Sequence, residues 1–293
     1  MIAIDWSARS SPSPKRPVKD AIYVCAQRLG HPIAHPKYFR TRHAAMDHLN
    51  ALLEAEMTSG RTVFVGFDFG FGYPQGFAEA LTGRAEALAI WDWLEARIED
   101  KADNQNNRFE VAAEMNRSFA GIGPFWGAPP QLSLPGLPHK GSARHSHGLA
   151  EHRQTEIAAN AQSPWKLYTT GAVGSQSLLG LPYLSRLRKR LGKRCQVWPM
   201  EGLELRNSSA VILAEIYPSF LTTKADLEKL NISWPDQGYN IIDAGQVRGC
   251  CDRLEKLFRS DPRLHSLGPV NVPEAVQIEE GWIMGVTARQ GQQ

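Results

Sequence analysis

The first 60 residues alternate short apolar stretches with polar stretches that contain breakers. Apolar segments at 1–8, 21–29 and 36–42 are each bounded by proline, glycine or polar residues, and they predict three strands in an antiparallel meander. Residues 42–58 carry apolar side chains at helical spacing, and Gly60 is suited to end that helix.

A β-branched, apolar run then predicts a buried fourth strand over 61–69. The helix before it makes a β–α–β connection, which places this strand in the same sheet and parallel to its predecessor. Later apolar runs predict strands at 195–201 and 210–220 and a helix at 240–258. The predicted fold class is therefore α/β, with a mixed sheet flanked by helices.

The middle of the chain is less regular. Helices are expected near 76–100, over 108–119 and over 174–193, with a loop of unusual length at 121–148. We therefore expect a core formed by 1–74 and 208–293, interrupted by a helical and loop-rich insertion at 75–207.

Composition narrows the class of protein. The net charge is +3 and the sequence pI is about 8.7, which permits an anionic partner without requiring one. There is no apolar run of about 18 residues and no basic-then-apolar leader, so we expect neither a membrane span nor secretion. The four cysteines form no CxxC pattern, which is typical of reduced thiols in a cytoplasmic protein.

Four acidic residues interrupt or border apolar segments, and these are the candidate catalytic residues: Asp5, Asp68, Glu215 and Asp243. A carboxylate among apolar residues is costly to bury unless it is compensated. Several such oxygens on rigid elements suit a divalent cation, and Mg²⁺ or Mn²⁺ held in this way can act on a phosphoryl group. The alternative is that the acids are separate, for example Asp243 as a helix cap and Glu215 in an ion pair.

The order of elements, with Asp5 in the first strand, Asp68 at the end of the fourth and Asp243 at the start of a late helix, resembles the ribonuclease H-like fold. More closely, the segments IDWSA, GFDFGFGYP, AEIYPSF and IIDAGQVR resemble an uncharacterised domain-of-unknown-function family of predicted nucleases. The resemblance spans almost the whole chain through short motifs. It implies that Asp5, Asp68 and Asp243 are the metal ligands, with Glu215 as an additional acid.

One feature departs from ribonuclease H itself, which has a glutamate in the first helix facing the site. Here Glu54 and Glu56 are close to the end of the predicted helix. The resemblance therefore bears more on the fold than on substrate choice.

Candidate substrate-binding residues are polar or cationic side chains near glycine-rich turns or within the predicted insertion. Lys166 and Gln176 flank a glycine-rich turn that leads into a helix, where anions bind readily. Arg117 and Arg153 border the long loop, and Ser7 follows the first-strand acid.

We interpret the chain as a metal-dependent phosphodiester hydrolase, a predicted nuclease acting on nucleic acid or a nucleotide. Two alternatives remain open. One is a nucleotide-dependent phosphotransferase or small-molecule biosynthetic enzyme that uses the same cleft, and the other is a non-catalytic binding protein that retains the acids for the fold or for ligand capture.

Overall fold

The computed structural model describes residues 1–32, 34–222 and 241–287, which form two compact units. The first unit comprises 1–68, 101–105 and 191–268, and the second comprises 69–100, 106–190 and the residues from 269 onward. Among the described residues, no helix is long and apolar enough to cross a membrane.

The first unit contains a six-stranded mixed sheet with the strand order β3-β2-β1-β4-β6-β5. Strand β2 runs antiparallel to β1 and β3, whereas β1, β4, β6 and β5 are mutually parallel. The strands are β1 (Ile2–Asp5), β2 (Ile22–Ala26), β3 (Lys37–Phe39), β4 (Val63–Phe67), β5 (Cys195–Trp198) and β6 (Val211–Glu215).

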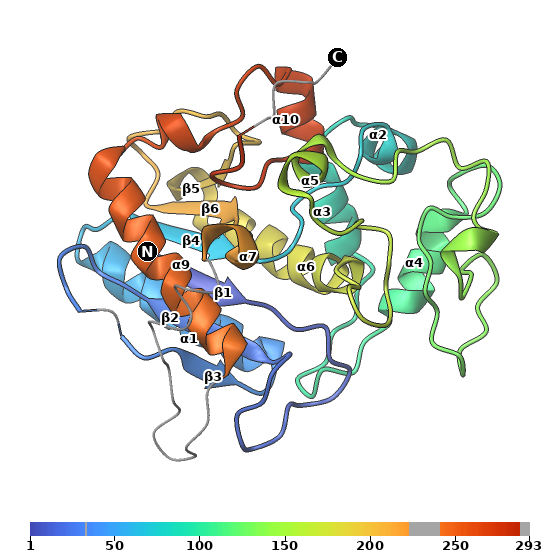
Figure 1. Cartoon of the computed structure of the whole chain (residues 1–293), viewed down its shortest axis with the longest axis horizontal. Coiled ribbons are helices and arrows are strands. Elements are labelled where there is room, and N and C mark those ends of the chain that lie inside the picture. Colours follow the sequence, from blue (N-terminus) through green and yellow to red (C-terminus); the bar gives the residue numbers. More distant parts are fainter. Residues whose placement is uncertain (33, 223–240, 288–293) are drawn as a thin grey trace. The chain divides into compact units, whose positions relative to one another are not determined.

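Helices α1 (Arg42–Thr58) and α9 (Ile242–Ser260) pack on this sheet, and α7 (Pro218–Leu221) follows β6. Figure 1 shows α9 crossing in front of β1 and β2, with α1 behind the sheet. Helix α1 begins where the Thr41 hydroxyl accepts a hydrogen bond from the Ala44 N–H, as an N-cap residue does. Short 3-10 turns lie at Gly192–Arg194 and His265–Leu267.

Strand pairing assigns side chains to the two faces of the sheet. Ala3 and Asp5 pair with Cys25 and Tyr23, and the Cys251 thiol of α9 donates to the Cys25 carbonyl at 3.4 Å. These side chains therefore share the α9 face. Neighbours in sequence such as Ile4 occupy the opposite face, because side chains alternate along a strand.

The second unit is mainly helical. Its core includes an aromatic cluster of Tyr73, Phe77, Phe125 and Trp165, in which the ring centroids of Tyr73 and Trp165 are 5.3 Å apart. Its helices are α2 (Phe77–Thr82), α3 (Ala87–Glu95), α4 (Arg108–Asn116), α5 (Gln154–Ala159), α6 (Gly174–Leu191) and α10 (Glu274–Glu280), with a 3-10 turn at Gly141–Ala143.

The structure confirms the predicted strands, α1, α6 and α9, but it changes two expectations. The single helix expected near 76–100 is two helices, because Gly83 adopts a left-handed conformation (φ 76°) and ends α2. Strand β5 was placed within the insertion at 75–207, yet it pairs with β6 and forms an edge of the sheet.

The unit boundaries also differ from the expected ones. The second unit takes in the residues from 269 onward, which we had assigned to the core segment 208–293. Part of that segment lies outside the described residues.

Candidate carboxylate site

Asp5 and Asp68 are at the carboxyl ends of two adjacent parallel strands. Ile4 of β1 pairs with Phe67 of β4, so the residues that follow, Asp5 and Asp68, are brought together on the same face. The Asp68 N–H donates to the Ile4 carbonyl at 3.2 Å, and the Trp6 N–H donates to Asp68 Oδ1 at 2.7 Å. The first bond fixes the backbone of Asp68, and the second orients its carboxyl group.

The two carboxyl groups are hydrogen-bonded to each other. Burial, followed by the charge of Asp68, raises the pKa of Asp5 well above its usual range. Burial also raises the pKa of Asp68 to about 7, despite the opposing hydrogen bonds from Asp5 and the Trp6 N–H. A carboxyl pair of this kind retains a proton near neutral pH because two close like charges repel.

Asp243 joins this pair from the first turn of α9. It contributes to the raised pKa values of both Asp5 and Asp68 through charge repulsion. Burial raises the pKa of Asp243 itself, and its Oδ2 accepts a hydrogen bond from the Asp20 N–H at 2.5 Å. The three acids predicted as metal ligands therefore lie near one another within the first unit.

Asp20, which we had not predicted from the sequence, is a fourth acid at this site. It lies just before β2 in a left-handed conformation (φ 59°), and its charge also raises the pKa values of Asp5 and Asp243. Its carbonyl accepts from the Ser7 hydroxyl at 2.9 Å and from Arg9 Nε at 3.1 Å. The only sequence signal was an acid bordering an apolar strand, at the end of a polar, proline-rich connection.

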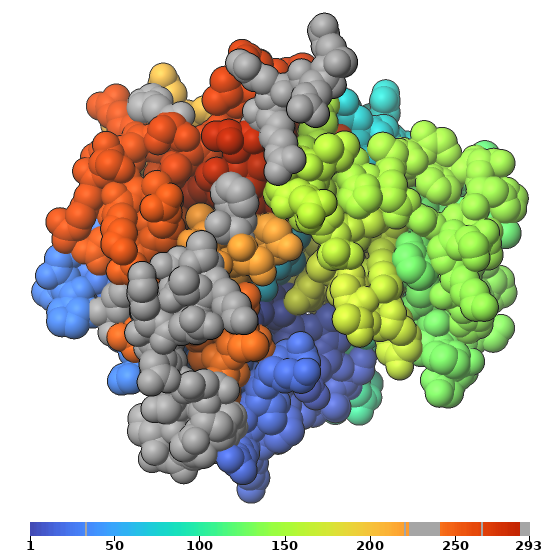
Figure 2. Space-filling view, in the orientation of Figure 1, coloured from blue at the N-terminus to red at the C-terminus, as the bar shows by residue number. Residues whose placement is uncertain are grey.

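Figure 2 shows the blue N-terminal segment and the orange helix α9 side by side on one face of the first unit. Hydrogen bonds join them: the Asp20 N–H donates to Asp243, and the Gly30 N–H and Gln27 Nε2 donate to Glu255 at 3.0 and 2.8 Å. The position of Asp243 is thereby tied to the β1–β2 connection.

Glu215 does not share this face. It pairs in register with Phe67, one residue before Asp68, and so its side chain is on the side of the sheet opposite to Asp5 and Asp68. Glu215 is buried there. We therefore remove it from the candidate carboxylate site, because strand alternation separates it from the other acids.

The glutamates of α1 are also elsewhere. Glu54 is exposed, and Glu56 forms ion pairs with Arg28 and Arg61. Hydrogen bonds from Arg61 and Arg28 hold the pKa of Glu56 at about 2. The first helix thus contributes no glutamate to the site.

The acids of this site are not held in ion pairs with basic side chains of the described residues. Within residues 1–32, 34–222 and 241–287, no ion pair joins Asp5, Asp68 or Asp243 to an arginine or lysine. The same residues contain no group of three or more His, Cys, Asp or Glu side chains already arranged to hold a metal ion. The site is therefore a close pair of carboxyl groups with two further acids nearby.

Of the predicted substrate-binding residues, only Ser7 belongs to the first unit, where it is buried and bonded to the Asp20 carbonyl. Arg117, Lys166 and Gln176 belong to the second unit. Arg117 is exposed, and Lys166 Nζ donates to the Thr170 carbonyl at 2.6 Å.

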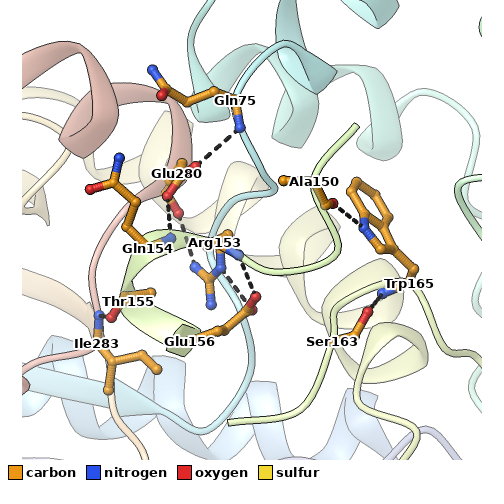
Figure 3. Close-up of polar contacts among 10 residues, drawn as sticks. All are labelled: Gln75, Ala150, Arg153, Gln154, Thr155, Glu156, Ser163, Trp165, Glu280 and Ile283. Carbon is orange, nitrogen blue, oxygen red and sulfur yellow. Dashed lines mark hydrogen bonds and ion pairs between the residues drawn. The ribbon is translucent and has the colours of Figure 1, made fainter. Parts of the chain in front are cut away.

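Arg153, also in the second unit, is only 1% exposed. Figure 3 shows its guanidinium between Glu156 and the Glu280 carbonyl, with Nε donating to Glu156 Oε1 and Nη1 to the Glu280 carbonyl, both at 2.9 Å. The Glu280 carboxylate accepts from the Gln154 and Gln75 N–H groups at 2.7 and 3.1 Å. This network attaches α10 to α5, and it assigns Arg153 a structural role.

The chain matches no protein-family model, no curated protein sequence and no solved structure. The geometry of the carboxylate site therefore carries the functional argument.

Proposed function

We propose that this protein is a metal-dependent phosphodiester hydrolase with a ribonuclease H-like core that acts on nucleic acid or a nucleotide. The observation that carries the proposal is the direct contact between the Asp5 and Asp68 carboxyl groups at the ends of adjacent strands. Two carboxyl groups in contact, with no arginine or lysine paired to them among the described residues, are costly unless a cation or a proton accompanies them.

The topology supports the fold part of this proposal. A three-stranded antiparallel meander, β1 to β3, is followed by a helix and by β4 parallel to β1, which is the order that suggested the resemblance. Asp243 in the first turn of α9 is the acid expected at the start of a late helix. Strand β5, at the far edge beyond β6, is an addition to that order.

The donor atoms fit Mg²⁺ or Mn²⁺, because both ions prefer carboxylate oxygens. Asp5, Asp68 and Asp243 would hold the ion, and Asp20 would add negative charge. When bound, such an ion supplies Lewis-acid stabilisation of the phosphoryl oxygens and a more acidic water. The Trp6 and Asp20 N–H groups donate hydrogen bonds that orient the carboxylates of Asp68 and Asp243.

A reducing, cytoplasmic location is part of the same proposal. All four cysteines are buried and none of them forms a disulfide bond, which supports a compartment in which thiols stay reduced.

The test is calorimetry of Mn²⁺ binding, followed by hydrolysis assays on single-stranded and duplex DNA, RNA and nucleotides. Wild type should bind Mn²⁺ and turn over at least one substrate class, whereas the Asp5→Asn/Asp68→Asn variant should do neither. Glu215→Gln is the matched control, since it removes a buried carboxylate from the other face. If wild type binds no Mn²⁺, or if the double variant binds it equally well, the proposal is wrong.

A further inference from the structure

A pocket is present in the first unit at the amino ends of the parallel strands, whereas the carboxylate site is at their carboxyl ends. It is a partly open pocket of about 770 Å³ at the amino ends of β1 and β4, lined there by Ile2, Val63 and Phe64. This volume is within the range of small-molecule sites, roughly 300–1,000 Å³. Asp5 is three residues further along β1 than Ile2, so about 10 Å of strand separates the pocket from the carboxylate site.

Most of the pocket wall is apolar. Phe64 and Phe258 form one wall, with ring centroids 5.2 Å apart at 64°. Leu52 of α1 and Ile212 of β6 line it as well, and Leu29, which is 56% exposed, is also among the lining residues. An apolar ligand body would therefore be removed from water on several sides.

The charged side chains that line the pocket carry more positive than negative charge. Arg28 and Arg61 both pair with the single carboxylate of Glu56, with Arg28 Nη2 to Glu56 Oε1 at 2.6 Å. Glu56 remains ionised because these two arginines hold its pKa at about 2. Among the side chains of the lining, two guanidinium groups and one carboxylate leave a net charge of +1, and Met1, which carries the N-terminal ammonium group, lines the pocket as well.

Both guanidinium groups also have N–H donors that the ion pairs with Glu56 do not use. Arg61 uses only Nε towards Glu56, and within the described part of the chain its two terminal nitrogens donate to no other group. The side chains of Arg28 and Arg61 are 57% and 45% exposed, so a ligand can reach both. Arginine presents its donors in a planar fork that matches a carboxylate.

We propose that this pocket binds a monocarboxylate with an elongated apolar body, such as a medium-chain fatty acid, with the carboxylate at Arg28 and Arg61. A negatively charged carboxylate matches the excess positive charge of the lining side chains, and the apolar wall matches an alkyl chain. The site is independent of the proposed hydrolase activity, because it shares no residue with the carboxylate site.

The test uses 11-(dansylamino)undecanoic acid, whose fluorescence rises in an apolar site, displaced by octanoate or by its neutral isostere octanamide. Wild type should bind the probe saturably, and octanoate should displace it at a concentration at least tenfold lower than octanamide does. Arg28→Gln removes the excess positive charge, and it should weaken octanoate about tenfold while leaving octanamide unchanged. Arg84→Gln is the matched control, because Arg84 is similarly exposed (58%) and pairs with Glu86 away from the pocket lining.

A second experiment fills the pocket with a bulky side chain. Ala34 is an exposed lining residue, and Ala34→Trp should abolish binding of the probe and of both competitors. Leu205→Trp tests the same point from another part of the lining if Ala34→Trp fails to fold by circular dichroism. The proposal is overturned if wild type shows no saturable binding, if binding survives occlusion, or if Arg28→Gln and Arg84→Gln behave alike.

Discussion

The carboxyl groups of Asp5 and Asp68 share a hydrogen bond across the ends of two parallel strands. This contact distinguishes the site from an ordinary acidic surface, where side chains turn away from one another into water. It also makes the site sensitive to cations, to pH and to single amide substitutions.

Mn²⁺ should stabilise the wild-type protein against heat. A ligand that binds only the folded state at 100 times its dissociation constant contributes about 2.7 kcal/mol, which is roughly 4–5 °C for a protein of this size. In Asp68→Asn this shift should disappear, and the metal-free melting temperature should rise or stay level because like-charge repulsion is removed. Differential scanning calorimetry with and without Mn²⁺ measures both effects. A wild-type shift retained in Asp68→Asn would contradict the assignment.

Without metal, stability should fall as pH rises from about 4 to about 7. In that window the native state, in which the pKa of Asp68 is about 7, binds more protons than an unfolded chain with an ordinary value of 3.8. The free energy of unfolding therefore decreases with pH, and the contribution of the pair is fully present only below pH 4. Urea denaturation from pH 4 to 8 should show this slope in wild type and a flatter one in Asp68→Asn. An equal slope in both proteins would rule out the shared proton.

Asp20→Asn separates the contribution of the Asp20 carboxylate from that of its backbone N–H. Asparagine tolerates the left-handed conformation and keeps the N–H that donates to Asp243, so the fold should be unchanged. Only the carboxylate is lost. Calorimetry should therefore show Mn²⁺ affinity reduced by less than in Asp68→Asn, on the order of three- to tenfold. Loss of all Mn²⁺ binding would instead make Asp20 a principal ligand.

Arg153→Ala should be strongly destabilising because Arg153 is the centre of a buried hydrogen-bond network in the second unit. The Arg153 and Glu156 side chains are 1% and 4% exposed, and removing one partner of such a buried pair costs about 3–5 kcal/mol. Arg97→Ala, which breaks the half-exposed pair with Glu114, should cost about 1 kcal/mol or less. Urea denaturation of the two variants compares them directly, and similar losses would refute the buried-network interpretation.

Local sequence patterns were sufficient to predict most elements of the core. Alternating and helical apolar patterns are local properties of the chain, so α1 was predicted with its observed bounds and β1 and β4 to within three residues at each end. The strand predicted over 210–220 ends at Glu215, because Pro218 begins α7. The acids at the ends of apolar strands were visible for the same reason, and Asp5, Asp68 and Asp243 do lie near one another.

Which acids share a face of the sheet depends on strand pairing, which local sequence patterns do not show. Glu215 and Asp68 have the same sequence signature, yet strand pairing turns them to opposite sides of the sheet, because a shift of one residue reverses the direction of a side chain. Asp20 was missed because its position depends on a left-handed turn and on a helix more than 200 residues later in the chain. Arg153 was predicted to bind substrate because a local sequence pattern shows neither the burial of a side chain nor its hydrogen-bond partners from distant segments.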